Sequence, residues 1–421
     1  MRVVLPHRFR ALRHRNFRLF FAGQSLSLVG TWLQQVAMGW LTYRVTGSPL
    51  LLGVVAFSSN IGILVLGPFA GVLADRVDRR RALLVTQSLL LVQAVGLAVL
   101  TAAGRIEVWH LIGFALWLGT VSAFDVPLRQ SFYVHLVEDR DDMPNAIALN
   151  SFMVNGARVV GPALAGVLLA LTGEAVAFAL NALSFVAVIA AIALVRWPAM
   201  RRPAAHAGWW ANWIDGFRYT FGQPPIRMLL ALVAVLSWTI TPYSSLMPIY
   251  AATIYGGGPG TLGLLLASAG AGALASTLYL AGRPSIVGLG RVIAIAAATA
   301  GLALAAFSHL RVLPLALVLL TLVGGGVILA AASTNTILQT IVDDRLRGRV
   351  AGFFTMAFLG MAPLGNLAAG ALAKAVGAPL TFAVNGLLCA AVSLWFWHRL
   401  PTIRRLLRPT YERLGLLPGE T

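Results

Sequence analysis

The stretch GVLADRVDRRR, residues 71–81, joins two apolar runs at residues 49–74 and 82–103. Each run has the roughly 20 apolar residues that a helix needs to cross the hydrocarbon core of a bilayer. The stretch between them carries four arginines and two aspartates. This order of apolar run, charged turn and apolar run predicts two membrane helices whose adjoining ends lie on the same side of the membrane.

The whole chain repeats this pattern. Of its 421 residues, 58% are hydrophobic and 11% charged, whereas an ordinary soluble domain has about 25% charged residues. This balance excludes a cytoplasmic enzyme, a secreted domain and a disordered chain. Most runs are too long for barrel strands, and helices satisfy their own backbone groups in lipid. We therefore expect an all-α membrane protein with twelve membrane helices, near residues 17–43, 49–74, 82–103, 107–128, 144–171, 174–195, 226–254, 260–282, 289–308, 312–336, 349–375 and 378–398.

The formal net charge of +18 would suggest a nucleic-acid partner in a soluble protein. If both termini are cytoplasmic, however, most of the 32 Lys and Arg residues fall in cytoplasmic tails and loops. The positive-inside rule then explains the charge by orientation alone. We expect a multi-pass protein of the bacterial cytoplasmic (inner) membrane, embedded in lipid, monomeric and without a nucleic-acid partner. The basic N-terminus leads directly into the first run, so it is interpreted as an uncleaved signal anchor.

The longest polar stretch inside the chain, residues 197–225, separates six apolar runs from six others. Its Trp209, Trp210 and Trp213 indicate either an amphipathic helix in the membrane interface or a helix packed under the bundle. The predicted domains are an N-terminal six-helix bundle (1–196), a cytoplasmic linker (197–225), a C-terminal six-helix bundle (226–400) and a cytoplasmic tail (401–421).

The two halves also share residues at nearly constant spacing. Residues 46–62 align with 256–272 at an offset of 210, and Gly161 aligns with Gly365 at an offset of 204. Such order predicts a duplicated six-helix unit. Because each unit has an even number of spans, the copies have the same orientation, and a substrate site is expected between them near the bilayer midplane.

The stretch 71–81, placed between the second and third of twelve runs, resembles the signature loop of the major facilitator superfamily. The resemblance covers nearly the whole chain and implies two pseudo-symmetric six-helix bundles. In that family this loop latches the halves together on the cytoplasmic side, here with the start of run eleven (347–350) as partner. It implies a gating role for Gly71, Asp75, Arg76, Arg79 and Arg80. The alternative is that these charges only orient the helices. Residues 281–291, the equivalent stretch of the second half, contain no Asp, so the latch is expected to be one-sided.

Residues 123–137 and 145–166 look like the efflux branch that includes the enterobactin exporter and macrolide efflux proteins. Within them, Gly156, Gly161, Pro162 and Gly166 resemble the span-five antiporter motif of proton-driven exporters, although one glycine of that motif is absent on each side. The alternative is helix packing, which small residues and a bending proline also serve.

Asp125 is the one carboxylate placed inside a predicted span rather than at its end, and Arg129 follows it by one helical turn. Arg158 lies in the fifth span. Ionisable groups are costly in the membrane, so these three are functional candidates. Either Asp125 takes up a proton or changes partner between Arg129 and Arg158 during transport, or it forms a permanent ion pair between the fourth and fifth spans.

In the superfamily, spans one, four, seven and ten line the substrate cavity. Sparse polar side chains among apolar ones suit an amphiphilic small molecule, although helix packing is the alternative for each. The candidates on these spans are Gln34, Gln35, Trp40, Trp238, Tyr243, Asn335 and Gln339.

The chain has no GxxxxGK[ST] loop for ATP, and its scattered His residues and single Cys389 predict neither a metal site nor a cofactor.

The acidic run at 138–142 is interpreted as solvated surface charge. An enzyme is not expected, because Asp125 has no partner carboxylate or His within a span. We expect a secondary transporter that exports a small molecule by alternating access, with protons as the coupling ion. The alternatives are an importer or lysophospholipid flippase of the same fold, or a non-transporting scaffold or sensor.

Overall fold

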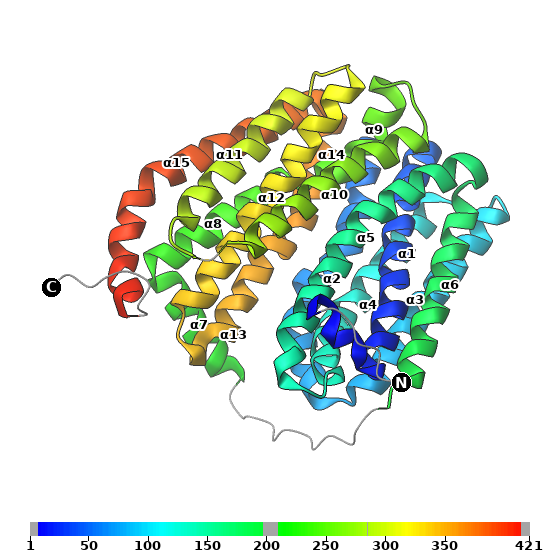
Figure 1. Cartoon of the computed structure of the whole chain (residues 1–421). Coiled ribbons are helices and arrows are strands. Elements are labelled where there is room, and N and C mark those ends of the chain that lie inside the picture. Colours follow the sequence, from blue (N-terminus) through cyan, green and yellow to red (C-terminus); the bar gives the residue numbers. More distant parts are fainter. Residues whose placement is uncertain (1–6, 197–208, 284, 414–421) are drawn as a thin grey trace. The chain divides into compact units, whose positions relative to one another are not determined.

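The computed structural model describes residues 7–196, 209–283 and 285–413; within these ranges, side chains are not described at 7–9, 68, 71–76, 134, 140, 209–213, 344 and 413. Helices make up nearly all of the described chain, and no strand occurs in it (Figure 1). The α-helices are α1 (Arg15–Thr46), α2 (Pro49–Arg76), α3 (Arg79–Ala102), α4 (Val108–Tyr133), α5 (Met143–Thr172), α6 (Glu174–Leu194), α7 (Trp209–Gly222), α8 (Pro224–Thr239), α9 (Tyr243–Ile249), α10 (Pro259–Ala281), α11 (Leu289–Phe307), α12 (Leu313–Ile341), α13 (Asp344–Thr355), α14 (Met361–Val376) and α15 (Ala378–Arg413).

Eleven segments of the described chain are long and apolar enough to cross a membrane. The helix missing from that set, α1, is also long enough, with 32 residues. Its glutamines, among them Gln24, Gln34 and Gln35, make it less apolar than the others. It packs against α2, α5 and α6 as part of a helical bundle. The expected all-α membrane fold is therefore confirmed, with α1 as the twelfth span by length and packing.

Two compact units can be distinguished by their internal packing. The first contains Met1–Ala205 and Met247–Ala267, and the second contains His206–Leu246 and Ser268–Thr421. The domain boundaries at 196, 226 and 400 stay a prediction.

Glycines bring the helices close together at equivalent places in the two halves. A Cβ on Gly62 of α2 would overlap the carbonyl of Gly119 on α4, and one on Gly272 of α10 would overlap Thr321 on α12. These are the second and fourth spans of their halves, and Gly62 and Gly272 are the pair that the repeat aligned. The internal duplication expected from the sequence is thus visible in the packing.

Span seven and span eleven are both broken helices. Span seven consists of α8, α9 and a π-helical turn η4 (Tyr250–Ile254), and Pro242 lies at the break between α8 and α9. Span eleven consists of α13, the π-helical turn η5 (Met356–Gly360) and α14. Proline lacks a backbone N–H, so it ends the α8 ladder. The hydroxyl of Ser237 on α8 donates to the carbonyl of Phe358 within η5, which ties the two broken spans together.

Candidate functional site

Asp125 lies two-thirds of the way along α4, and its side chain is almost completely buried. Its Oδ1 accepts two hydrogen bonds from the neighbouring helix α3, from Thr86 Oγ1 at 2.8 Å and from Gln87 Nε2 at 2.7 Å. Its Oδ2 faces Arg129 Nη2 at 3.5 Å, one turn along the same helix. The predicted pairing with Arg129 is therefore present. Thr86 and Gln87 were not anticipated, because no sequence pattern aligns the residues of α3 with those of α4.

Arg158 lies on α5 with its guanidinium 5.5 Å from the centre of the Trp32 ring. This is the geometry of a cation–π contact, which ties α5 to α1. The hypothesis of a partner exchange between Arg129 and Arg158 remains a prediction.

The glycines of the span-five motif have different surroundings. A Cβ on Gly161 would overlap the side chain of Trp32, and one on Gly166 would lie 2.9 Å from the Cα of Gly263 on α10. No atom lies within 4 Å of a Cβ placed on Gly156. Close helix packing thus accounts for Gly161 and Gly166, while Gly156 faces open space. Pro162 lies inside α5, which continues through it to Thr172.

The stretch 71–81 is more helical than the sequence suggested. The helix α2 continues to Arg76, and α3 begins at Arg79, so only Val77 and Asp78 connect them. Asp78 caps α3, since its Oδ1 accepts from the backbone N–H of Arg81 at 2.8 Å. An aspartate directly before a helix is a known capping signal, and it was available in the sequence. The side chains of Gly71, Asp75 and Arg76 lie outside those that the structure describes.

The two remaining arginines of the predicted gate have partners within the first unit. Arg79 Nη1 lies 3.4 Å from His135 Nε2, just after α4. Arg80 donates from Nε to the carbonyl of Ile192 at 3.2 Å and from Nη2 to the carbonyl of Ala193. These carbonyls belong to the last turn of α6, and that of Ile192 also accepts from the backbone N–H of Val195 at 3.3 Å. In this structure Arg80 therefore fastens the start of α3 to the end of α6.

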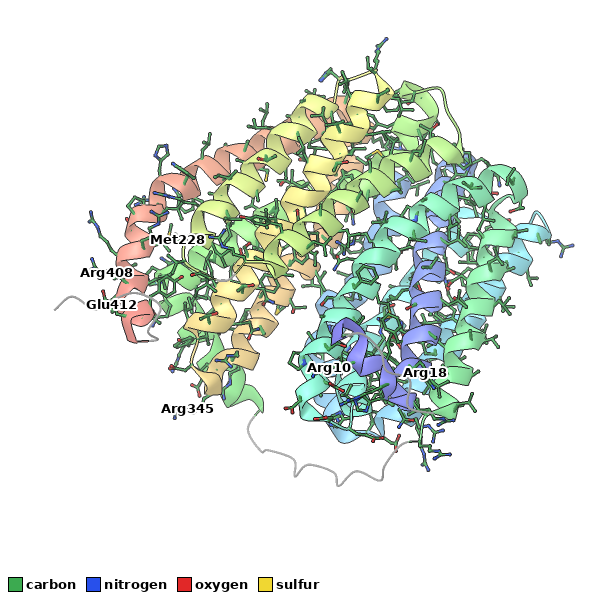
Figure 2. All side chains as sticks on the ribbon, in the orientation of Figure 1. Arg10, Arg18, Met228, Arg345, Arg408 and Glu412 are labelled. Atoms are coloured by element: carbon green, nitrogen blue, oxygen red, sulfur yellow. The ribbon has the colours of Figure 1, made fainter. Side chains whose placement is uncertain are left out.

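The interpretation of the acidic run at 138–142 as solvated charge is wrong for Asp142. That side chain is fully buried and lies among three basic groups of the N-terminal segment: Arg13 Nε at 2.8 Å, His14 Nε2 at 2.9 Å and Arg10 Nε at 3.4 Å. Figure 2 shows Arg10 at this end of the first unit. Asp139 remains exposed, with Arg13 Nη2 at 3.0 Å. The partners are more than 120 residues apart in sequence, so the run alone could not reveal them.

The electrostatics of Asp142 follow from this cluster. Burial by itself would raise its pKa, but the hydrogen bond with His14 and the charges of Arg13 and Arg10 outweigh that effect and hold the pKa below its usual range. The backbone N–H of Ala11 also donates to Asn145 Oδ1 at 2.9 Å. The 3₁₀ helix η1 (His7–Arg13) is thus fastened to the junction between α4 and α5.

Gln34, predicted to line a substrate cavity, is 1% exposed. Its Oε1 accepts from Asn181 Nδ2 at 2.8 Å, and its Nε2 donates to Gln93 Oε1 at 3.0 Å. Gln93 in turn donates to the carbonyl of Phe114 at 3.2 Å. This amide network joins α1, α3, α4 and α6, so the polar groups of Gln34 are used inside the bundle.

The other six cavity candidates have side chains with accessible surface. Gln35 is exposed, and the rest are partly exposed. On α12, next to Asn335, the hydroxyls of Ser333 and Thr334 are buried without a hydrogen-bond partner among the described residues. The partly exposed candidates are Trp40, Trp238, Tyr243, Asn335 and Gln339.

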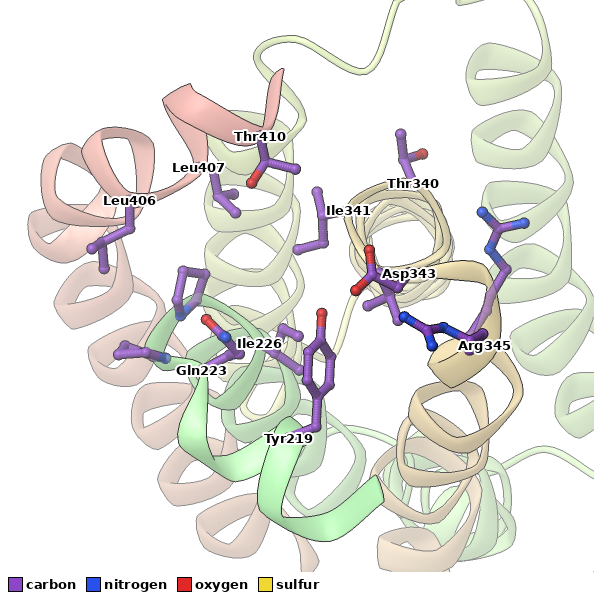
Figure 3. Close-up of a pocket in the computed structure, with 14 residues that line it drawn as sticks. Tyr219, Gln223, Ile226, Thr340, Ile341, Asp343, Arg345, Leu406, Leu407 and Thr410 are labelled. Carbon is purple, nitrogen blue, oxygen red and sulfur yellow. The ribbon is translucent and has the colours of Figure 1, made fainter. Parts of the chain in front are cut away.

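A cavity of about 650 Å³ lies in the second unit where α7, α12, α13 and α15 meet (Figure 3). The hydroxyl of Tyr219 and the carboxylate of Asp343 point into it, and Leu406 and Leu407 of α15 form an apolar wall. Burial and the nearby charge of Asp343 raise the pKa of Tyr219. None of the predicted cavity residues is among those that line it.

The helix α7, which contains the three linker tryptophans, packs against α8 and α13 within the second unit. Phe217 and Phe221 contact Phe353 of α13. A Cβ on Gly216 would lie 2.9 Å from the Cβ of Arg349. Of the two interpretations of residues 197–225, the described part of this segment therefore favours a helix packed under the bundle.

Comparison with curated proteins shows relatives of full length. The chain is 27% identical to the staphyloferrin A transporter of Staphylococcus aureus, covering 91% of this chain and 96% of the relative. It is 27% identical to the multidrug efflux pump Tap of Mycolicibacterium fortuitum, with 90% and 93% covered. It is 24% identical to the enterobactin exporter EntS of Citrobacter koseri, with 94% of each covered.

Solved structures share the fold at lower identity. A POT family transporter in complex with 5-aminolevulinic acid superposes with a TM-score of 0.75 at 12% identity, over 92% of this chain and 96% of that one. A bacterial homologue of the lysosomal transporter Spinster gives 0.74 at 13%, over 94% and 98%.

A family model described as "Transmembrane secretion effector" matches residues 7–410. The match includes both halves, the linker between them and the stretch 71–81. The predicted resemblance to the efflux branch is confirmed, and a multi-pass protein with a small-molecule substrate follows from the relatives. The chain belongs to the transmembrane secretion effector family of major facilitator superfamily transporters.

Proposed function

We propose that this protein is a secondary active transporter that exports a small amphiphilic molecule by alternating access in exchange for protons. Proton coupling is supported by the burial of Asp125 inside α4. Its carboxylate lies 3.5 Å from Arg129 and accepts hydrogen bonds from two neutral side chains of α3, Thr86 and Gln87. A buried carboxylate held by a single, distant cation can be neutralised by a proton more readily than one enclosed by several cations.

The direction and the substrate class are taken from the relatives. Of the three relatives described above, one is named a multidrug efflux pump, one an enterobactin exporter and one a staphyloferrin A transporter. Siderophores and drugs are amphiphilic molecules that sparse polar groups in an apolar pocket suit. We propose that Gln35, Trp40, Trp238, Tyr243, Asn335 and Gln339 line the substrate path, and that Gln34 serves the internal amide network.

The proposal also includes a cytoplasmic gate at the stretch 71–81 and an orientation with both termini in the cytoplasm. Asp75 and Arg79 latch the stretch 71–81 to the start of span eleven on the cytoplasmic side, where the positive-inside rule also places both termini. The halves, residues 1–196 and 226–400, rock against each other in the bacterial cytoplasmic membrane, and one chain is sufficient for transport.

Inside-out membrane vesicles test this function directly, because an exporter moves its substrate into them. Vesicles with an acidified interior are offered a catecholate siderophore, a macrolide and a lysophospholipid, and both accumulation and loss of the pH gradient are recorded. We expect one of the first two to accumulate and to dissipate the gradient. Asp125→Asn should remove the dissipation, whereas Glu138→Gln, an exposed carboxylate on the loop after α4, should not.

Other outcomes would point elsewhere. Accumulation only in right-side-out vesicles would indicate an importer, and movement of lysophospholipid alone would indicate a flippase. An absence of flux for any compound, in protein shown to be folded, would favour a scaffold or sensor.

A further inference from the structure

We infer that Thr86 and Gln87 of α3 are positioning residues that direct the coupling proton to Oδ2 of Asp125. In this assignment the proton replaces Arg129, and the release of Arg129 is the first movement that protonation causes. The inference rests on the proposed role of Asp125 in proton coupling, and it adds which oxygen is protonated, what holds the other oxygen and which side chain responds.

The two carboxylate oxygens of Asp125 have unequal surroundings. Oδ1 accepts from Thr86 at 2.8 Å and from Gln87 at 2.7 Å, and both donors are at least nine-tenths buried. An oxygen that already accepts two short hydrogen bonds has few directions left for a proton. Protonation at Oδ1 would require the Gln87 amide to turn away. It would also require the single proton of the Thr86 hydroxyl to be donated to the carbonyl of Leu83, 3.1 Å from Thr86 Oγ1.

Oδ2 faces only Arg129 among the described hydrogen-bond donors and cations, and the 3.5 Å separation is long for a charge-assisted hydrogen bond. A proton can bind there without any change in the two bonds to Oδ1. It converts the carboxylate to a neutral carboxyl group, and the positive charge of Arg129 then has no anion beside it. Because 23% of the Arg129 side chain is exposed, against 4% for Asp125, the arginine is the partner that can leave.

Other charges near α4 lie toward the helix ends. The elements that pack against α4 are α1, α2, α3 and the 3₁₀ turn η2 (Val134–Leu136). At the end of α2 the side chains of Asp75 and Arg76 are not described. The described ionisable groups of these elements and of α4 itself, apart from the pair, are Arg15, Arg18, Tyr43, Arg44, Arg79, Arg80, Arg81, His110, Tyr133 and His135. Arg79 is engaged with His135, and Arg80 with the end of α6.

Gln87 adds a second reason for this arrangement. Its Nε2 is committed to Asp125, while its Oε1 is buried without a hydrogen-bond partner among the described residues. Leaving a buried acceptor unsatisfied is unfavourable, so the amide would be expected to take another orientation if its only role were packing. Donation to a carboxylate explains the orientation that is observed.

Infrared difference spectroscopy of the purified full-length protein tests which oxygen is protonated. With the proton on Oδ2, the C=O bond of Asp125 ends at Oδ1 and is lowered in frequency by two hydrogen bonds. Thr86→Val and Gln87→Leu should each raise the frequency of this band, and Thr86→Ser should restore it. Asp125→Asn identifies the band by removing it. Frequencies that stay unchanged in both variants would place the proton on Oδ1 and overturn the inference.

The pH profile of transport supplies the functional measurement. Removing one donor to the charged form should raise the apparent proton affinity about tenfold, while the KM for substrate stays within about twofold of the native value. Ser88→Ala is the matched control, because Ser88 is the next residue on α3, is exposed and donates to the carbonyl of Leu84. Its profile should be that of the native protein.

The two levels of the proposal fail in different ways. If Asp125→Asn still exchanges substrate for protons, the proposed coupling role is wrong. If Asp125→Asn loses coupling but Thr86→Val and Gln87→Leu keep the native pH profile and band frequency, coupling stands and the positioning role is wrong. Thr86→Val and Gln87→Leu each remove one donor to Oδ1, so if one of them fails to fold, the other still tests which oxygen is protonated.

Discussion

Two buried aspartates of the first unit, Asp125 and Asp142, have opposite surroundings. Asp142 lies outside the membrane helices, fully buried among Arg10, Arg13 and His14 at 2.8 to 3.4 Å. Asp125 lies within α4 and has one arginine at 3.5 Å and two neutral donors. Asp142 is thus enclosed by basic groups, whereas Asp125 has Arg129 as its one charged partner among the described residues, at a long distance.

Burial of a carboxylate can therefore serve either a fixed contact or the exchange of a proton. Burial disfavours the charged form of Asp142, and the nearby basic groups overcome that effect. Three basic groups keep Asp142 ionised and fasten the N-terminal segment to the α4–α5 junction. At Asp125 the neutral donors Thr86 and Gln87 orient the carboxylate without adding positive charge, and Oδ2 remains the oxygen to which we assign the proton. The same substitution, Asp to Asn, should therefore have different consequences at the two sites.

The largest expected effect is on transport at Asp125. Asp125→Asn should lose proton-driven accumulation of substrate, while downhill movement of the substrate persists, because asparagine cannot exchange a proton. Its unfolding temperature should stay close to the native one, since the amide retains a hydrogen-bond acceptor for Thr86 and Gln87. Flux with and without a pH gradient in proteoliposomes measures this. Full accumulation would make Asp125 a structural residue like Asp142.

Asp142→Asn should instead reduce stability. It leaves Arg10 and Arg13 without their buried anion, and a hydrogen bond to a charged group contributes about 2 kcal/mol. We expect a lower unfolding temperature in detergent and faster proteolysis at the N-terminal arginines. Protein that remains folded should keep proton-driven accumulation. Loss of coupling in the folded variant would show that the two aspartates do not have separate roles.

The pH dependence of the N-terminal contact follows from the lowered pKa of Asp142. A carboxyl group with a folded-state pKa below its unfolded value of 3.8 stabilises the fold above that value. This contribution is lost only as the pH falls through the folded-state value. Hydrogen exchange of residues 10–16 should therefore be constant from pH 7 to about pH 5, after correction for the intrinsic rate, and should rise in stronger acid. A rise that begins above pH 5 would contradict the assignment to Asp142.

The sequence predicted one of these sites better than the other, for a physical reason. Asp125 and Arg129 are four residues apart in a long apolar run, so helical periodicity alone brings them together. Asp142 belongs to an acidic run in a loop, and its partners Arg10 and Arg13 are in another part of the chain. Contacts between distant segments depend on tertiary packing, which periodicity does not contain.

The same limit applies elsewhere in the fold. The positions of the spans and the internal repeat follow from apolar length and glycine spacing, and both were predictable. The amide network of Gln34 was not, because an intramembrane glutamine is equally compatible with a cavity wall and with a partner on another helix. The side-chain oxygen of Gln34 accepts a hydrogen bond from Asn181, and its nitrogen donates one to Gln93. The hydrogen bonds of Arg80 to the last carbonyls of α6 were likewise not predictable, and its gating role stays a prediction.

The smallest expected effect separates charge from hydrogen bonding within the Asp142 cluster. Asn145→Ala removes the neutral bond from the Ala11 N–H at 2.9 Å and leaves all three basic partners of Asp142 in place. A neutral hydrogen bond contributes about 1 kcal/mol, so the unfolding temperature should fall by less than in Asp142→Asn. Hydrogen exchange should increase at Ala11 and not at the residues that follow His14. If Asn145→Ala is as damaging as Asp142→Asn, the backbone bond rather than the enclosed charge holds the N-terminal segment, and the contrast with Asp125 would rest on packing instead of on the number of cations.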